Sequence, residues 1–159
     1  MEMRHTLSVL VENKPGVLAR VAELFARRGF NIESLAVGTT DRPDISRMTI
    51  VVDVAEKSLE QVRKQLHKLV NVIEISDLDP ERSVDRELML VKIKVVRETR
   101  SEVIEMVDIF RGKIVDVGRD SIIVEITGNA SKIAAFEDLV RNYGIKEIAR
   151  TGKVALPRG

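Results

Sequence analysis

The hydrophobic period of the chain changes in a fixed order, and this order constrains the fold more than any other feature. Apolar and polar residues alternate over residues 5–11, which is typical of a strand with one buried face. From Val17 the apolar residues recur at every third or fourth position, which is the period of an amphipathic helix. The pattern up to residue 78 predicts the order strand, helix, strand, strand, helix, strand.

The same order of elements follows again after residue 86. We expect strands at 5–11, 31–39, 46–54, 72–78, 87–96, 113–117, 121–127 and 145–149. We expect helices at 17–28, 59–69, 103–110 and 132–143. The repeat concerns the order of the elements and not the residues themselves.

Local residue chemistry predicts where the helices begin and end. Pro15 suits the start of the first helix because its missing N–H costs nothing there, and Gly29 is expected to end that helix in a left-handed conformation. Ser58 with Gln61 predicts a capping box, and Ser131 is the expected cap of the last helix. The apolar face of the first helix is expected to contain Val17, Leu18, Val21, Leu24 and Phe25.

Two βαββαβ units in tandem predict an α+β chain of two ferredoxin-like domains, each an antiparallel sheet with both helices on one face. The polar segment 80–85 begins with Pro80 and is the expected linker between domains at 4–79 and 86–159. Each half has roughly 75 to 80 residues, which is marginal for burying a core alone. The open sheet face and the sheet edges also need cover. Both facts favour a homodimer or a higher oligomer.

The composition excludes several classes of function. The chain carries 26 Lys and Arg against 25 Asp and Glu, so neither nucleic acid nor an anionic membrane is an expected partner. Aromatic residues make up only 3% of the chain, and stacking platforms for single-stranded nucleic acid need them. Cysteine is absent, which excludes disulfides and thiolate sites. No stretch resembles a signal peptide or is long enough to span a bilayer, so we expect a cytoplasmic protein.

The sequence offers no set of residues that forms an active site. It has no glycine-rich phosphate loop of either common type. His5 and His67 lie far apart and have no ligand-like companions. The carboxylates alternate with basic residues along the predicted helix faces, which is typical of solvated surfaces. We therefore expect a non-catalytic chain with no metal and no cofactor of its own.

The turn Asn13-Lys14-Pro15-Gly16 is the one local feature that indicates ligand chemistry. It places a strand end against a helix start, where the first backbone N–H groups lack internal partners and attract an anion such as a carboxylate. Gly16 has no Cβ and leaves room for a ligand. The Asn13 amide both donates and accepts, which suits an α-amino acid. The alternative explanation is a plain strand-to-helix turn in which Asn13 is a local cap.

These motifs resemble a known family. The turn 13–18, followed by a helix and by Gly29-Phe30-Asn31-Ile32, resembles the signature of the ACT domain, a small-molecule sensor of amino-acid pathways. Further stretches resemble the small, regulatory subunit of acetolactate synthase, also called acetohydroxyacid synthase. These stretches are 7–13, 27–35, 46–50, 64–70, 86–92 and 110–117.

The resemblance implies a regulatory subunit of branched-chain amino-acid biosynthesis. Its partner would be a separate large catalytic subunit that carries thiamine diphosphate, FAD and magnesium. The small subunit would activate that partner and confer feedback inhibition by valine. The family's ACT domains pair side by side and hold the effector between them. The effector positions carry over to Asn13, Gly16, Val17 and Leu18 of one chain and to Asn31 and Ile32 of the other.

Two alternatives remain open from the sequence. One is a stand-alone ACT-type amino-acid sensor, such as a transcriptional regulator, although no helix-turn-helix pattern precedes Arg4 or follows Ala149. The other is a small ferredoxin-like enzyme, which would need a group of reactive side chains.

Overall fold

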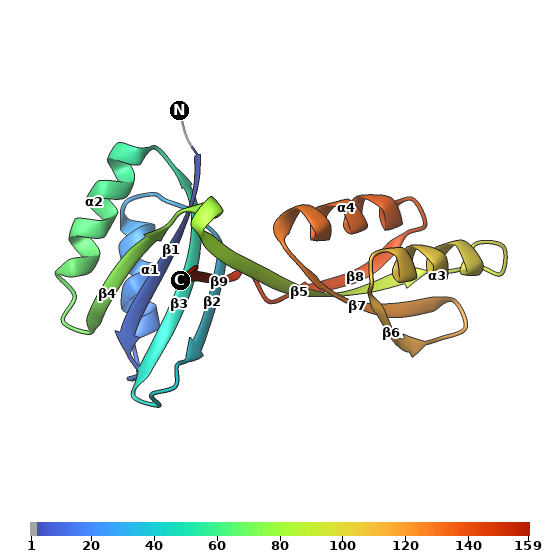
Figure 1. The fold of residues 1–159 in the computed structure, drawn as a ribbon, viewed down its shortest axis with the longest axis horizontal. Helices are drawn as coiled ribbons and strands as arrows, with labels where there is room; N and C mark the ends of the chain where they lie inside the picture. The colour runs from blue at the N-terminus through green and yellow to red at the C-terminus, as the bar shows by residue number, and fades with distance from the viewer. Residues whose placement is uncertain (1–2) are drawn as a thin grey trace. The chain divides into compact units, whose positions relative to one another are not determined.

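The computed structural model describes residues 3–159, and the chain forms two compact units (Figure 1). The first unit contains the described residues up to Val84 together with Lys153–Gly159, and the second contains Asp85–Gly152. The division between Val84 and Asp85 lies within the predicted linker at 80–85. The predicted domain at 86–159 also includes the C-terminal segment, which the contacts group with the first unit.

The first unit has the predicted order of elements. The strands β2, β3, β1 and β4 form an antiparallel sheet in this spatial order. Helices α1 and α2 cover one face of that sheet (Figure 1). The elements are β1 (Met3–Glu12), α1 (Val17–Arg27), β2 (Ile32–Thr39), β3 (Ile45–Val54), α2 (Glu56–His67) and β4 (Val72–Leu78), followed by a 3₁₀ turn at Pro80–Arg82. The α+β, βαββαβ plan is confirmed here.

The second unit repeats the plan. Its strands pair in the order β6-β7-β5-β8, and residues of α3 and α4 join the apolar core on one face of the sheet. The elements are β5 (Ser83–Lys94), α3 (Arg100–Ile109), β6 (Lys113–Val117), β7 (Ser121–Gly128), α4 (Ala130–Arg141) and β8 (Ile145–Arg150). A further short strand, β9 (Val154–Pro157), belongs to the first unit and was not predicted.

Burial in the first unit follows the alternation of the central strand β1. Leu7, Val9 and Val11 face the helices and are buried. Burying an aliphatic side chain of this size stabilises the fold by about 1.5 to 3 kcal/mol. The helix α1 packs on this face through Val17, Val21 and Phe25. The buried residues of the strand pattern and those of the helix pattern therefore pack in one core, as the sequence predicts.

The predicted position of Leu18 on the core face is wrong. Its side chain is 45% exposed. Neighbouring residues of an α-helix are about 100° apart, so Leu18 points along the protein surface once Val17 and Val21 point at the sheet. Leu18 is thus an apolar side chain at the start of α1 that solvent reaches.

The end of α1 agrees with the prediction. Gly29 has a φ of +71°. Its N–H donates to the carbonyl of Ala26, and the N–H of Phe30 donates to the carbonyl of Phe25, both at 3.0 Å. This pair of bonds is a Schellman motif, which favours glycine at the left-handed position.

The predicted caps of α2 and α4 are wrong. Ala55 is the N-cap of α2, and the residue that caps α4 is Asn129, whose side-chain oxygen accepts the N–H of Lys132 at 3.0 Å. Each helix begins before the predicted cap, Ser58 or Ser131, because the preceding strand ends directly before the N-cap residue. The tertiary position of the strand end decides the helix start here.

The C-terminal segment lies against the sheet face of the first unit that the helices leave open. The backbone N–H of Lys153 donates to Ser34 Oγ of β2 at 2.9 Å. Pro157 borders a small cavity of about 130 Å³ with Ser8 and Leu10 of β1. The N–H of Arg158 donates to the carbonyl of Arg82 at 2.7 Å. The chain itself therefore supplies cover for a face that we predicted to need a partner.

Burial at β9 gives a stability prediction with an internal control. Ala155 is 6% exposed and its neighbour Val154 is 51% exposed. Ala155→Asp would bury a carboxylate and should lower the free energy of unfolding by about 2 to 3 kcal/mol. Val154→Asp should change it by less than about 0.5 kcal/mol. Urea unfolding of both variants measures the difference, and equal values would contradict the packing of β9.

The end of α3 gives a second stability prediction. Arg111 occupies the left-handed position of a Schellman motif with a φ of +58°, and the N–H of Gly112 donates to the carbonyl of Val107 at 2.8 Å. Glycine is favoured at this position. Arg111→Gly should raise the free energy of unfolding by about 0.5 to 1 kcal/mol. Arg111→Ala keeps the strained backbone and should not raise it, so a gain in both variants would exclude this explanation.

Candidate functional site

The turn between β1 and α1 leaves the start of the helix open. Gly16 is the N-cap residue of α1, has a φ of +84°, and provides no side-chain cap. The N–H of Arg20 donates to the carbonyl of Gly16 at 3.1 Å. The N–H groups of Leu18 and Ala19 have no acceptor among residues 3–159. These donors and the helix dipole together can attract a negatively charged group.

The conformation of Gly16, more than the space around it, requires a glycine. A Cβ placed there would meet only the Arg20 guanidinium, at 3.9 Å. The positive φ is a conformation that residues with a Cβ adopt at a cost of about 1 to 2 kcal/mol. The empty space in front of the turn is therefore available to a ligand.

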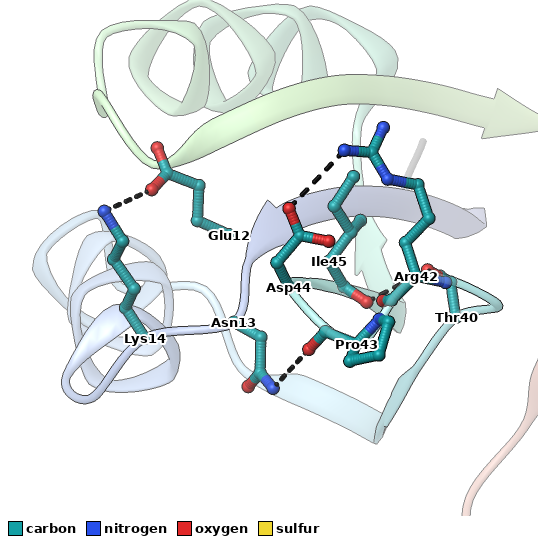
Figure 2. A network of polar contacts seen from close by, with 8 residues as sticks. All are labelled: Glu12, Asn13, Lys14, Thr40, Arg42, Pro43, Asp44 and Ile45. Atoms are coloured by element: carbon teal, nitrogen blue, oxygen red, sulfur yellow. Dashed lines mark hydrogen bonds and ion pairs between the residues drawn. The ribbon is translucent and has the colours of Figure 1, made fainter.

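Asn13 links the turn to the loop between β2 and β3, as Figure 2 shows. Its side-chain N–H₂ donates to the carbonyl of Pro43 at 3.0 Å, and its backbone N–H donates to the carbonyl of Asp44 at 2.8 Å. The side-chain oxygen of Asn13 receives no hydrogen bond from the described residues. Asn13 thus has the structural role of a local link and keeps an acceptor for a ligand.

The side chains of Val17 and Leu18 differ in their access to the turn. Val17 is 4% exposed and packs in the core, so only its backbone faces the turn. Leu18 is exposed beside the open N–H groups. Of these two predicted site residues, Leu18 alone offers a side chain to a ligand.

Asn31 and Ile32 lie at the opposite end of α1 from the turn. The helix α1, which separates these two residues from the turn, has 11 residues, which corresponds to about 16 Å. Asn31 is exposed, and Ile32 begins β2 opposite Val52 of β3. The predicted site residues of one chain therefore form two separate groups, one at each end of α1.

Among the side chains that the structure describes, the titratable groups with shifted pKa values lie on the surface of the second unit. A hydrogen bond at 2.7 Å raises the pKa of Lys92 and lowers the pKa of Glu147. A bond from Lys146 lowers the pKa of Asp120, and a bond to Glu102 raises the pKa of Tyr143. These are exposed pairs with ordinary surface geometry, and they do not converge on a cavity.

Neither a metal cluster nor a membrane span occurs in the part of the chain that the structure describes. The described side chains include no group of three or more His, Asp or Glu placed to hold a metal ion. Among the same residues, no helix has the length and apolar character needed to cross a bilayer.

Two contacts of the first unit have no signal in the sequence. Arg20 reaches from α1 to the side-chain oxygen of Asn71, which precedes β4. The C-terminal segment covers part of the sheet. Both contacts join residues that are far apart in the chain, so neither produces a local periodic pattern.

Two family models match the chain, one for each half. Residues 7–74 match a model described as an AHAS small subunit-like ACT domain. Residues 86–159 match a model described as the small subunit of acetolactate synthase. Together the two matches cover most of both units.

Individual relatives match over nearly the full length. A probable acetolactate synthase small subunit from Archaeoglobus fulgidus is 62% identical over 157 residues, which cover 99% of this chain and 98% of the relative. The acetolactate synthase small subunit of Mycolicibacterium smegmatis is 55% identical, over 98% of this chain and 91% of its own length. The crystal structure of the small subunit from Thermotoga maritima has a TM-score of 0.91 at 48% identity and covers 99% of this chain and 98% of that one.

Proposed function

This chain belongs to the family of acetolactate synthase small subunits, and we propose on that basis that it senses valine and transmits feedback inhibition to the catalytic large subunit. As a small subunit it is regulatory and not catalytic. Because both halves of the chain match the family, we prefer this function to that of a stand-alone sensor. The observation that carries the proposal is the open start of α1 beside Gly16.

The effector carboxylate would bind at the start of α1. The N–H groups of Leu18 and Ala19 are donors without partners among the described residues, and hydrogen bonds to a charged acceptor contribute about 1.5 to 3 kcal/mol. The side-chain oxygen of Asn13 would accept a hydrogen bond from the effector ammonium group. The exposed side chain of Leu18 would contact an apolar side chain of valine size, whose burial contributes about 1.5 to 3 kcal/mol.

The strand register explains how a second chain would complete this site. β2 is an edge strand, and Thr39 at its end lies opposite Ser46 of β3, which lies opposite Val11 of β1. The Thr39 end of β2 is thus at the same end of the sheet as the turn. When two β2 edges pair about a two-fold axis, the strands run antiparallel and the start of one lies beside the end of the other. Asn31 of the partner subunit and Ile32 of the partner subunit would then lie near the turn.

The surface of α1 supports this pairing. The side of α1 that faces away from α2 carries small or apolar residues. These residues are Leu18, Ala19, Ala22 and Ala26. Small side chains let two helices approach closely, and Val37 on the neighbouring edge strand is 46% exposed. We therefore propose a homodimer through β2 and α1, with an effector site at each end of the shared interface.

A site shared between two chains couples ligand binding to their arrangement. An effector shifts the equilibrium between two arrangements only by its difference in affinity for them. Asn31 of the partner subunit would provide that difference, because it contacts the ligand only in the paired state, whereas Asn13 belongs to the same chain as the turn. The catalytic large subunit, bound to the small subunit, would respond to the arrangement of the dimer and would be activated by it in the absence of valine.

The remaining functional expectations concern the partner and not this chain. Thiamine diphosphate, FAD and magnesium would be held by the large subunit. We propose that the complex works in the cytoplasm, as expected for a biosynthetic enzyme.

Gly16→Asp should abolish valine sensitivity while activation of the large subunit persists. The added carboxylate would occupy the place of the effector carboxylate and repel it, which should raise the Kd for valine roughly tenfold or more. Gly16→Asn is the matched control, because it imposes the same backbone strain without the charge, and it should weaken binding less. Calorimetry with the small subunit alone measures both values, and unchanged valine binding by Gly16→Asp would remove the turn from the site.

Mixed dimers test whether two chains share the site. Gly16→Asp and Asn31→Ala should each lose valine binding as homodimers. A mixed dimer of the two variants should regain one intact site, because Gly16 of one chain then faces Asn31 of the other. After random subunit exchange, the sample should bind about a quarter of the valine that the unmodified protein binds. No recovery would show that Gly16 and Asn31 do not act across an interface.

A further inference from the structure

A groove with a basic rim runs between α1 and α2 on the helical face of the first unit. Its volume is about 390 Å³. Most of its charged lining residues are basic, and one is acidic. The lining residues are Arg20, Glu23, Leu24, Arg27, Arg28, Gln65, Lys68 and Leu69. We refer to this set of residues as the α1–α2 groove.

The positive charge of the α1–α2 groove is only partly neutralised. Glu23 pairs with Arg27 at 2.7 Å. Arg20 donates to the side-chain oxygen of Asn71, which is a neutral acceptor. Arg28 and Lys68 have no carboxylate within ion-pair distance among the residues that the structure describes. Since the whole chain has a net charge of +1, this groove is a local concentration of positive charge that attracts an acidic surface.

The groove also offers apolar contacts. Leu24 and Leu69 in its lining are partly buried and pack against the core. Directly after Leu69, Val70 is 90% exposed. An aliphatic side chain that protrudes this far beside a charged groove is suited to contact an apolar residue of a partner.

Two other surfaces of the first unit already have an occupant or a proposed one. The free face of the sheet carries the C-terminal segment. The side of α1 with Leu18, Ala22 and Ala26 faces the proposed homodimer. The α1–α2 groove lies on the opposite side of α1 and stays open when two chains pair through β2.

We propose that the α1–α2 groove binds an acidic segment of the catalytic large subunit, with Val70 as an apolar contact at the edge of the interface. The inference rests on membership of the small-subunit family. It depends on the proposed pairing through β2 in one respect, namely that this pairing leaves the groove accessible. Arg28 and Lys68 form ion pairs with carboxylates of that segment. The long stems of the arginine residues pack along its apolar atoms.

A double charge reversal tests the α1–α2 groove. Arg28→Glu with Lys68→Glu should weaken binding of the purified large subunit, without valine, by about tenfold or more, because like charges then meet in the interface. Lys57→Glu with Lys64→Glu makes the same change in net charge on exposed positions of α2 outside the groove and should leave binding unchanged. Binding of the unmodified protein should also weaken as salt increases. Equal binding by both double variants would overturn the proposal.

Two further measurements separate this proposal from a folding defect and from the proposed effector site. Val70→Ser should weaken large-subunit binding without changing the thermal unfolding temperature, because the side chain is almost fully exposed. Valine binding by the small subunit alone should be unchanged in the groove variants. If the effector proposal is wrong, valine binding by the small subunit will be the measurement that fails, and the binding of the large subunit will not be affected. Loss of self-association in Arg28→Glu with Lys68→Glu, with large-subunit binding retained, would assign the groove to a second copy of this chain instead.

Discussion

The burial of Val17, Val21 and Phe25 against the first sheet fixes the rotation of α1, and both proposed functional surfaces depend on that rotation. With these residues turned to the core, Leu18 and the alanines of α1 lie on one exposed side and the arginines on the other. At the start of the same helix, the N–H groups of Leu18 and Ala19 have no acceptor among the described residues. The proposed effector turn, the proposed pairing surface and the basic groove thus all lie on one helix, whose orientation is set by one group of core contacts.

This arrangement offers a physical basis for communication between effector and catalytic subunit. Protein interiors are close-packed, so a packed helix moves as a unit and not by local deformation. A ligand that binds two chains at the start of α1, as we propose, would act on the helix whose other side forms the basic groove. Arg20 lies near both places, since its guanidinium is close to Gly16 and also lines the groove. Asn71, which accepts its hydrogen bond, connects this region to β4.

The C-terminal segment changes the argument for a dimer. A small α+β unit with a bare sheet face would need a partner to cover it. Here the segment Lys153–Gly159 lies against that face and Ala155 is buried there. The unpaired edge of β2 remains, and an unpaired edge is a stronger reason for strand pairing than a covered face. The interface that we propose follows from this edge and from the small residues of α1.

The sequence by itself determined the order of the elements, the alternation of buried residues on β1, the turn at Gly16 and the end of α1 at Gly29. Each of these follows from a period or a backbone preference that acts over a few residues. Only the tertiary structure decided that Leu18 is exposed, that Asn13 donates to Pro43 across 30 positions, and that Lys153 donates to Ser34 across 119. It also moved the starts of α2 and α4 to the ends of the strands before them. These features depend on contacts between distant parts of the chain, and local sequence patterns do not predict such contacts.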